Sequence, residues 1–175
     1  MDSHILSVLV ENSSGVLGRV IGLISRRGFN IESLTVGETQ DPSISRMTII
    51  VPCDPAALDQ IVEQLRKLVC VLKVEVLPQS SALTRELLLV KVSTDTASRS
   101  EVLEIATIFR ARVVDVSSGS LTLEITGESD KSAALIGLLA GYGILEMART
   151  GAVSLSRGAR TIYWPADGEN ISEGW

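Results

Sequence analysis

The order of expected strands and helices constrains this chain more than any other feature, because one order occurs twice along its 175 residues. Apolar alternation and helical spacing predict strand, helix, strand, strand, helix and strand between residues 5 and 76. The same order restarts after a polar link at 78–81 and runs from residue 87 to residue 148. A repeated order of this kind indicates two small units rather than one core.

Each expected element has its own local signal. Asp54 as N-cap with Pro55 at the first helical position starts one helix, and a capping box at Ser98 and Glu101 starts another. Strands are expected at 5–10, 31–39, 46–52, 72–76, 87–92, 113–116, 121–125 and 144–148, and helices from Val16, Pro55, Ser98 and Ser129.

The repeated order βαββαβ predicts the α+β class, with two ferredoxin-like units whose antiparallel sheets carry helices on one face. We place the units at 1–78 and 84–157. Residues 158–175 form a tail that is expected to be flexible, because it is rich in glycine and acidic residues with little to bury.

Composition excludes several classes of function. Aromatic residues make up only 3%, so the cores must be aliphatic, and the net charge of -5 has the wrong sign for gathering nucleic-acid phosphates. The longest apolar stretch, 133–145, is too short to span a bilayer, and no basic leader begins the chain. We therefore expect a cytoplasmic protein with no nucleic-acid or membrane partner. Cys53 and Cys70 are expected to be buried thiols.

The sequence shows no set of catalytic residues. His4 is the only histidine, and no nucleophile motif accompanies it. The glycines form neither a dinucleotide fingerprint nor a phosphate loop, and the acidic residues have no metal-ligand spacing. We expect a chain without catalytic residues, without a metal and without a cofactor of its own.

The turn from the first strand into the first helix, 11–17, is the remaining candidate site. A helix start has amides without intrahelical partners and a partial positive charge, so a carboxylate can bind there. Gly15 permits close approach to the backbone, and Asn12 offers its oxygen to an ammonium and its amide to a carboxylate. The pattern suits a small neutral amino acid, although Ser13, Ser14 and Gly15 would also serve as an ordinary helix cap.

Several strings in these segments resemble the small subunits of acetolactate synthase, whose amino-terminal domain is an ACT domain. They are ILSVLVEN at 5–12, GVL at 15–17, RVIGL at 19–23, RGFNIESLTV at 27–36, SRMT at 45–48, QLRKLV at 64–69, RE at 85–86, LVKV at 89–92 and EMARTG at 146–151. The resemblance covers about residues 4 to 160, and the first unit is identified as an ACT domain on this basis.

The resemblance implies a dimer, formed through the ACT domain, that binds a large catalytic subunit containing thiamine diphosphate, Mg and FAD. It also implies activation of that subunit and feedback inhibition by valine or a related branched-chain amino acid. The ligand would lie between two ACT domains, held by Asn12, Ser13, Ser14, Gly15, Val16 and Leu17 of one chain and by Asn30 and Ile31 of its partner. Many ACT domains have proline where Ser14 stands, which leaves this loop more flexible.

Two alternatives remain open on the sequence. A free-standing ACT-type sensor would use the same loop for another target, and a ferredoxin-like RNA binder would share the order βαββαβ. RNA binders of that fold stack bases on exposed aromatic residues, whereas the expected strands here are aliphatic. One methylene is worth only about 1–3 kcal/mol in an apolar pocket, so valine, leucine and isoleucine all remain candidates.

Overall fold

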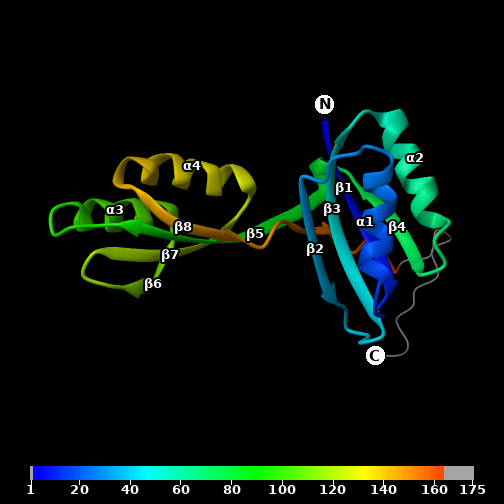
Figure 1. The fold of residues 1–175 in the computed structure, drawn as a ribbon, viewed down its shortest axis with the longest axis horizontal. Coiled ribbons are helices and arrows are strands. Elements are labelled where there is room, and N and C mark those ends of the chain that lie inside the picture. Colours follow the sequence, from blue (N-terminus) through cyan, green and yellow to red (C-terminus); the bar gives the residue numbers. More distant parts are fainter. Residues whose placement is uncertain (1, 164–175) are drawn as a thin grey trace. The chain divides into compact units, whose positions relative to one another are not determined.

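The computed structural model describes residues 2–163, which form two compact units. The first unit takes in the chain up to Leu83 and again from Val153, and the second runs from Thr84 to Ala152. Each unit has an antiparallel sheet with helices packed on one face, which confirms the predicted fold class (Figure 1).

The first unit has four strands and two helices, and its sheet order is β2-β3-β1-β4. Figure 1 shows both helices on the same side of this sheet. The elements are β1 (Asp2–Glu11), α1 (Val16–Arg26), β2 (Ser33–Glu38), β3 (Ile44–Cys53), α2 (Pro55–Arg66) and β4 (Val71–Leu77).

Strand alternation determines which residues of β1 face these helices. Leu6, Val8 and Val10 are fully buried and join Ile24 of α1 and Ile61 of α2 in one aliphatic core. The predicted start of α2 is confirmed, because the Ala57 amide donates to Asp54 Oδ1 over 2.8 Å.

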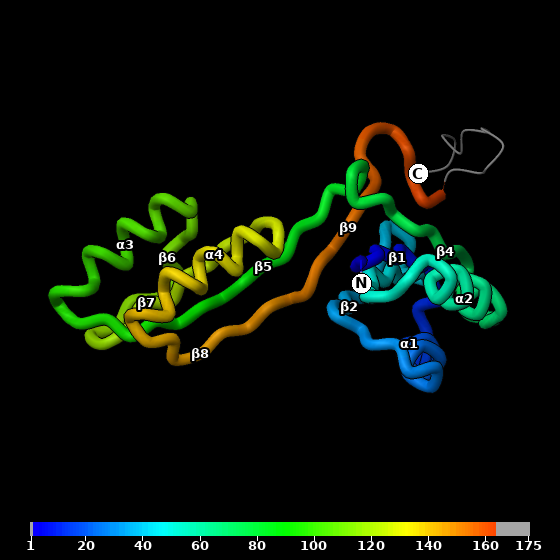
Figure 2. The backbone as a smooth tube through the Cα atoms, turned by 90° about the horizontal axis from the view of Figure 1, so that it is seen from above, coloured from blue at the N-terminus to red at the C-terminus, as the bar shows by residue number. Residues whose placement is uncertain are grey.

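The second unit repeats this topology with the sheet order β6-β7-β5-β8. Figure 2 shows its two helices on the same side of the sheet, and they cover a separate core that includes Leu88, Val90, Leu123 and Leu135. After the short 3-10 turn η1 (Gln79–Ser81), the elements are β5 (Ala82–Ser93), α3 (Ser98–Phe109), β6 (Arg112–Val116), β7 (Ser120–Gly127), α4 (Ser129–Leu139), the 3-10 turn η2 (Ala140–Tyr142) and β8 (Ile144–Arg149).

The end of the chain departs from the predicted domain boundary. We predicted a second unit over 84–157, but β9 (Val153–Ser156) belongs to the first unit and pairs with β5. The segment that contains β9 contacts the face of the first sheet that carries no helix. On that face Ile5, Ser7 and Leu9 are buried although they alternate with the helix-facing residues.

Side chains of the first sheet hold this returning segment. Arg46 Nη2 donates to the Ser154 carbonyl oxygen over 3.1 Å, and Arg160 Nη2 lies 2.7 Å from Glu75 Oε1. Ile162 is only 3% exposed. Within the predicted flexible tail, Arg160 therefore forms an ion pair with the first sheet and Ile162 is buried, while 158–161 are exposed. The rest of that tail, 164–175, lies outside the described residues.

Candidate functional site

The loop between β1 and α1 is attached to the turn between β2 and β3. The Asn12 amide donates to the Ser43 carbonyl oxygen over 2.7 Å. Asn12 Nδ2 donates to the Pro42 carbonyl oxygen over 2.8 Å and to Glu38 Oε1 over 3.1 Å. Both Asn12 and Glu38 are exposed. The loop is thus held on the sheet while its polar groups remain open to solvent.

Asp41 organises the turn that receives Asn12. The hydroxyl and amide of Ser43 both donate to Asp41 Oδ1, over 2.7 and 2.8 Å, and these hydrogen bonds hold the pKa of Asp41 below its ordinary value. The Thr39 hydroxyl also donates to the Asp41 carbonyl oxygen. The hydrogen bonds within this turn therefore fix the position of the Pro42 carbonyl that accepts from Asn12.

The start of α1 is open. Gly15 is the N-cap residue of α1 and has a φ of 83°, a left-handed conformation that favours glycine. No side chain caps the helix. A Cβ built at Gly15 would meet nothing within 4 Å, and the first turn contains no acidic residue. The Val16 amide donates to the Ser13 carbonyl oxygen over 3.4 Å. The amides that follow it in the first turn have no intrahelical acceptor, so this exposed helix start is suited to a carboxylate from outside the chain.

The structure brings residues 12 to 17 together but places Asn30 and Ile31 elsewhere. Val10 and Glu38 both align with Ser45 at one end of the sheet, whereas Ser33 aligns with Ile50 and Ile5 toward the other. The five residue-to-residue steps from Ser33 to Glu38 correspond to roughly 17 Å of strand. Asn30 and Ile31 precede β2 at that far end, so one chain does not join them to its own loop.

The equivalent loop of the second unit, between β5 and α3, has the opposite character. Asp95 Oδ1 accepts hydrogen bonds from the amides of Ala97 and Ser98, over 3.0 and 2.7 Å, and from the Ser98 hydroxyl. These bonds, above all that from the Ser98 amide, lower the pKa of Asp95. The prediction that Ser98 caps α3 is therefore wrong, because Asp95 takes this role from three residues earlier.

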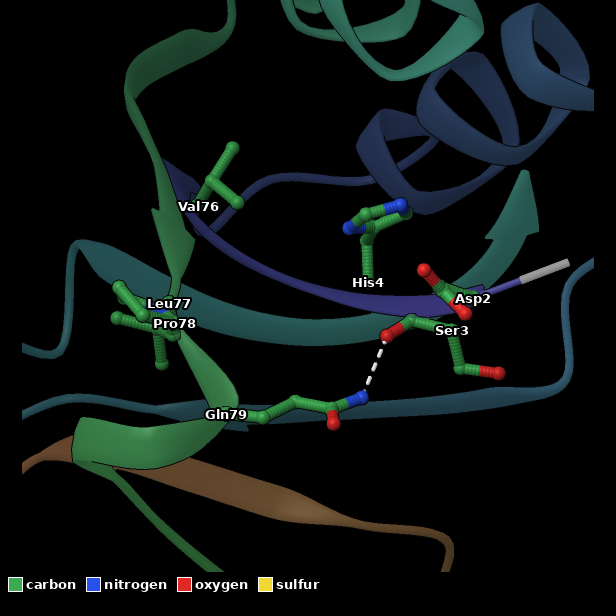
Figure 3. Close-up of a pocket in the computed structure, with 7 residues that line it drawn as sticks. All are labelled: Asp2, Ser3, His4, Val76, Leu77, Pro78 and Gln79. Atoms are coloured by element: carbon green, nitrogen blue, oxygen red, sulfur yellow. Dashed lines mark hydrogen bonds between the residues drawn. The ribbon is translucent and has the colours of Figure 1, made fainter. Parts of the chain in front are cut away.

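A cavity of about 490 Å³ lies at the opposite end of the first unit, beside His4 (Figure 3). His4 Nε2 lies 3.2 Å from the Cys53 carbonyl oxygen, and Gln79 Nε2 donates to the Ser3 carbonyl oxygen over 2.7 Å. The Ser3 hydroxyl donates to Glu32 over 2.7 Å. These polar groups engage one another and the backbone and do not form a nucleophile with its base.

Within the described part of the chain, no group of three or more histidine, cysteine, aspartate or glutamate residues is arranged to hold a metal ion. None of the helices between residues 2 and 163 is long and apolar enough to cross a membrane. Cys53 and Cys70 are both free and buried.

Sequence patterns did not predict the part that Glu38 and Pro42 play at the loop. Glu38 is separated from Asn12 by 26 positions and Pro42 by 30, and no local pattern connects either residue to Asn12. Only the pairing of β3 with β1 and β2 brings them to Asn12.

Comparisons with known proteins agree across both units. The model of the AHAS small subunit-like ACT domain matches residues 6–73, and the model of the small subunit of acetolactate synthase matches residues 85–158. The acetolactate synthase small subunit of Mycobacterium bovis is 52% identical over 160 residues, covering 91% of this chain and 95% of the relative. That of Mycolicibacterium smegmatis is 50% identical over 160 residues, covering 91% and 94%.

A solved structure agrees with these relatives. The crystal structure of the acetolactate synthase small subunit from Thermotoga maritima matches with a TM-score of 0.86 and 40% identity, covering 90% of this chain and 99% of that one. Because full-length relatives at half identity and a solved structure of the same fold agree, this chain belongs to the family of acetolactate synthase small subunits, and its first unit is an ACT domain.

Proposed function

We propose that this chain activates the catalytic subunit of an acetolactate synthase and makes it sensitive to valine or a related branched-chain amino acid. The observation that carries the proposal is the open start of α1 beside Asn12, which offers amides to a carboxylate and a polar side chain to an ammonium. The catalytic subunit would supply thiamine diphosphate, Mg and FAD, and this chain would contribute regulation alone.

A homodimer through the ACT domain would complete the site. β2 lies at the edge of its sheet and, within residues 2–163, pairs with β3 alone. Val36 on this strand is 44% exposed, and Leu17 at the start of α1 is 41% exposed. Antiparallel pairing of β2 with the same strand of a second copy would bring Asn30 and Ile31 of the partner toward the loop at Asn12.

Such a shared site also provides a mechanism of regulation. A ligand that contacts two chains favours the dimer arrangement in which both sets of contacts are made, and only this difference in affinity shifts activity. A tenfold shift needs about 1.4 kcal/mol. One carboxylate at a helix start contributes roughly 0.3–1 kcal/mol, so burial of the aliphatic side chain and hydrogen bonds from both chains must add to it.

The test is reconstitution with the catalytic subunit. The catalytic rate should rise when this chain is added and fall again as valine is titrated, and calorimetry should detect valine binding to this chain. Parallel titrations with leucine and isoleucine will rank the three amino acids. No activation, combined with failure to retain the catalytic subunit in a pull-down, would instead favour a free-standing ACT-type sensor.

A further inference from the structure

The hydrogen bonds of Asn12 determine which of its groups remains for a ligand. Its side-chain nitrogen has two hydrogens, and both are engaged, one by the Pro42 carbonyl and the other by Glu38. The side-chain amide of Asn12 is therefore not available to a carboxylate, although the sequence alone had left that role open. What Asn12 presents is its carbonyl oxygen, which is an acceptor.

Glu38 adds a negative charge at the same place. Glu38 is the last residue of β2. Its carboxylate accepts a hydrogen bond from Asn12 over 3.1 Å and takes part in none of the ion pairs found among residues 2–163. The uncapped start of α1, whose N-cap Gly15 is three residues beyond Asn12, supplies partial positive charge. The loop thus has an anion-binding side at the helix start and a cation-binding side at Glu38 and Asn12, which matches the two charges of a free amino acid.

We propose that Glu38 is a specificity-determining residue that, together with Asn12 Oδ1, binds the ammonium group of the effector. This inference rests on the proposed function and adds the rule by which the effector is selected. A 2-oxo acid with the same side chain has a carbonyl oxygen in place of the ammonium. Two acceptors would then face an acceptor, and a site built around an N–H donor rejects an analogue that lacks it.

The experiment compares valine with 3-methyl-2-oxobutanoate by calorimetric titration of the full chain. Wild-type protein should bind valine at least about a hundredfold more tightly than the 2-oxo acid. Glu38→Gln retains an acceptor for Asn12 but removes the charge. It should weaken valine binding about tenfold or more, strengthen binding of the 2-oxo acid and so reduce the selectivity sharply.

Two further variants separate charge from position. Glu38→Ala also removes the acceptor that holds Asn12, and it should weaken valine binding further. Glu63→Gln on α2, an exposed residue paired with Arg66, makes the same change in net charge away from the loop and should bind both compounds like the wild type.

The outcomes keep the two proposals distinct. If wild-type protein binds no valine, the proposed function fails. If wild-type protein binds valine and Glu38→Gln retains both its affinity and its preference over the 2-oxo acid, Glu38 does not read the ammonium and this inference is overturned.

Discussion

The loops before α1 and before α3 lie at the same place in two units of the same topology, yet the two helix starts differ. In each loop, the backbone amide of the first residue after the strand donates to a carbonyl oxygen of the neighbouring turn. The Asn12 amide donates to the Ser43 carbonyl oxygen, and the Thr94 amide donates to the Gly119 carbonyl oxygen over 2.9 Å. In the first unit the helix start has no cap, whereas in the second Asp95 occupies it. One fold therefore carries an uncapped helix start in one copy and a helix start capped by a carboxylate in the other.

Under the proposed function, the internal carboxylate of Asp95 would leave only the first unit open to an effector. A carboxylate already bound to the first amides of α3 excludes a ligand carboxylate by occupation and by charge. Arg99 also takes part in the second loop, since its Nη2 donates to the carbonyl oxygens of Ser117 and Ser118 over 2.7 and 2.8 Å. The start of α3 is thus capped from within the chain, whereas no side chain caps the start of α1.

The largest effects should come from breaking one core at a time. Leu6→Ala and Leu88→Ala each remove a fully buried side chain, and each should cost roughly 2–5 kcal/mol of unfolding free energy. Because the two cores share no residue, the loss should be confined to the altered unit. Hydrogen exchange resolved by unit tests this, and equal loss of protection in both units would show that they fold as one.

Gly15→Asp should remove valine binding. It places a carboxylate at the helix start, as Asp95 does in the second unit, and should weaken binding by at least about a hundredfold, or about 2.7 kcal/mol. Gly15→Asn is the matched control, because asparagine tolerates the left-handed backbone and is neutral. Calorimetry and circular dichroism provide the readout. Equal losses in both variants would point to shape rather than charge.

Asn12→Ala should weaken valine binding by about tenfold to a hundredfold, because a hydrogen bond to a charged group contributes roughly 1.5–3 kcal/mol. Thr94→Ala changes the equivalent position of the second unit and should leave binding unchanged. Inhibition curves with the catalytic subunit measure both, and activation should survive in both variants because neither position is in a core cluster. A shift with Thr94→Ala would bring the second loop into the site.

The smallest effects concern pH. The pKa values of Asp41 and Asp95 are lowered by hydrogen bonds, so the stability they contribute is present above the unfolded pKa of about 3.9 and is lost as pH falls through the lower folded values. Acid should loosen the Ser43 amide in the first unit and the Ala97 and Ser98 amides at the start of α3. Amide exchange measures this, with Asp41→Asn and Asp95→Asn as variants that should show no such dependence.

Much of the fold could be predicted from local pattern. The apolar run of β1 and the helical spacing in α1 and α2 depend on neighbours within a few positions, and the cap at Asp54 lies directly before its helix. The candidate loop at Asn12 and Gly15 was identified in the same way. Strand β9 could not be predicted in this way, because its four residues carry no local signal that they return to the first unit.

Local patterns in the sequence were enough to predict two units, their order of elements, the loop before α1 and the resemblance to acetolactate synthase small subunits. Only the tertiary structure brought Glu38 within hydrogen-bond distance of Asn12 and separated Asn30 and Ile31 from that loop. It also showed that the chain returns to the first unit from Val153. The physical reason is that periods of two and 3.6 residues tell which face of an element is buried. They do not tell which distant strand lies beside it, because that register is set when the whole sheet closes on its core.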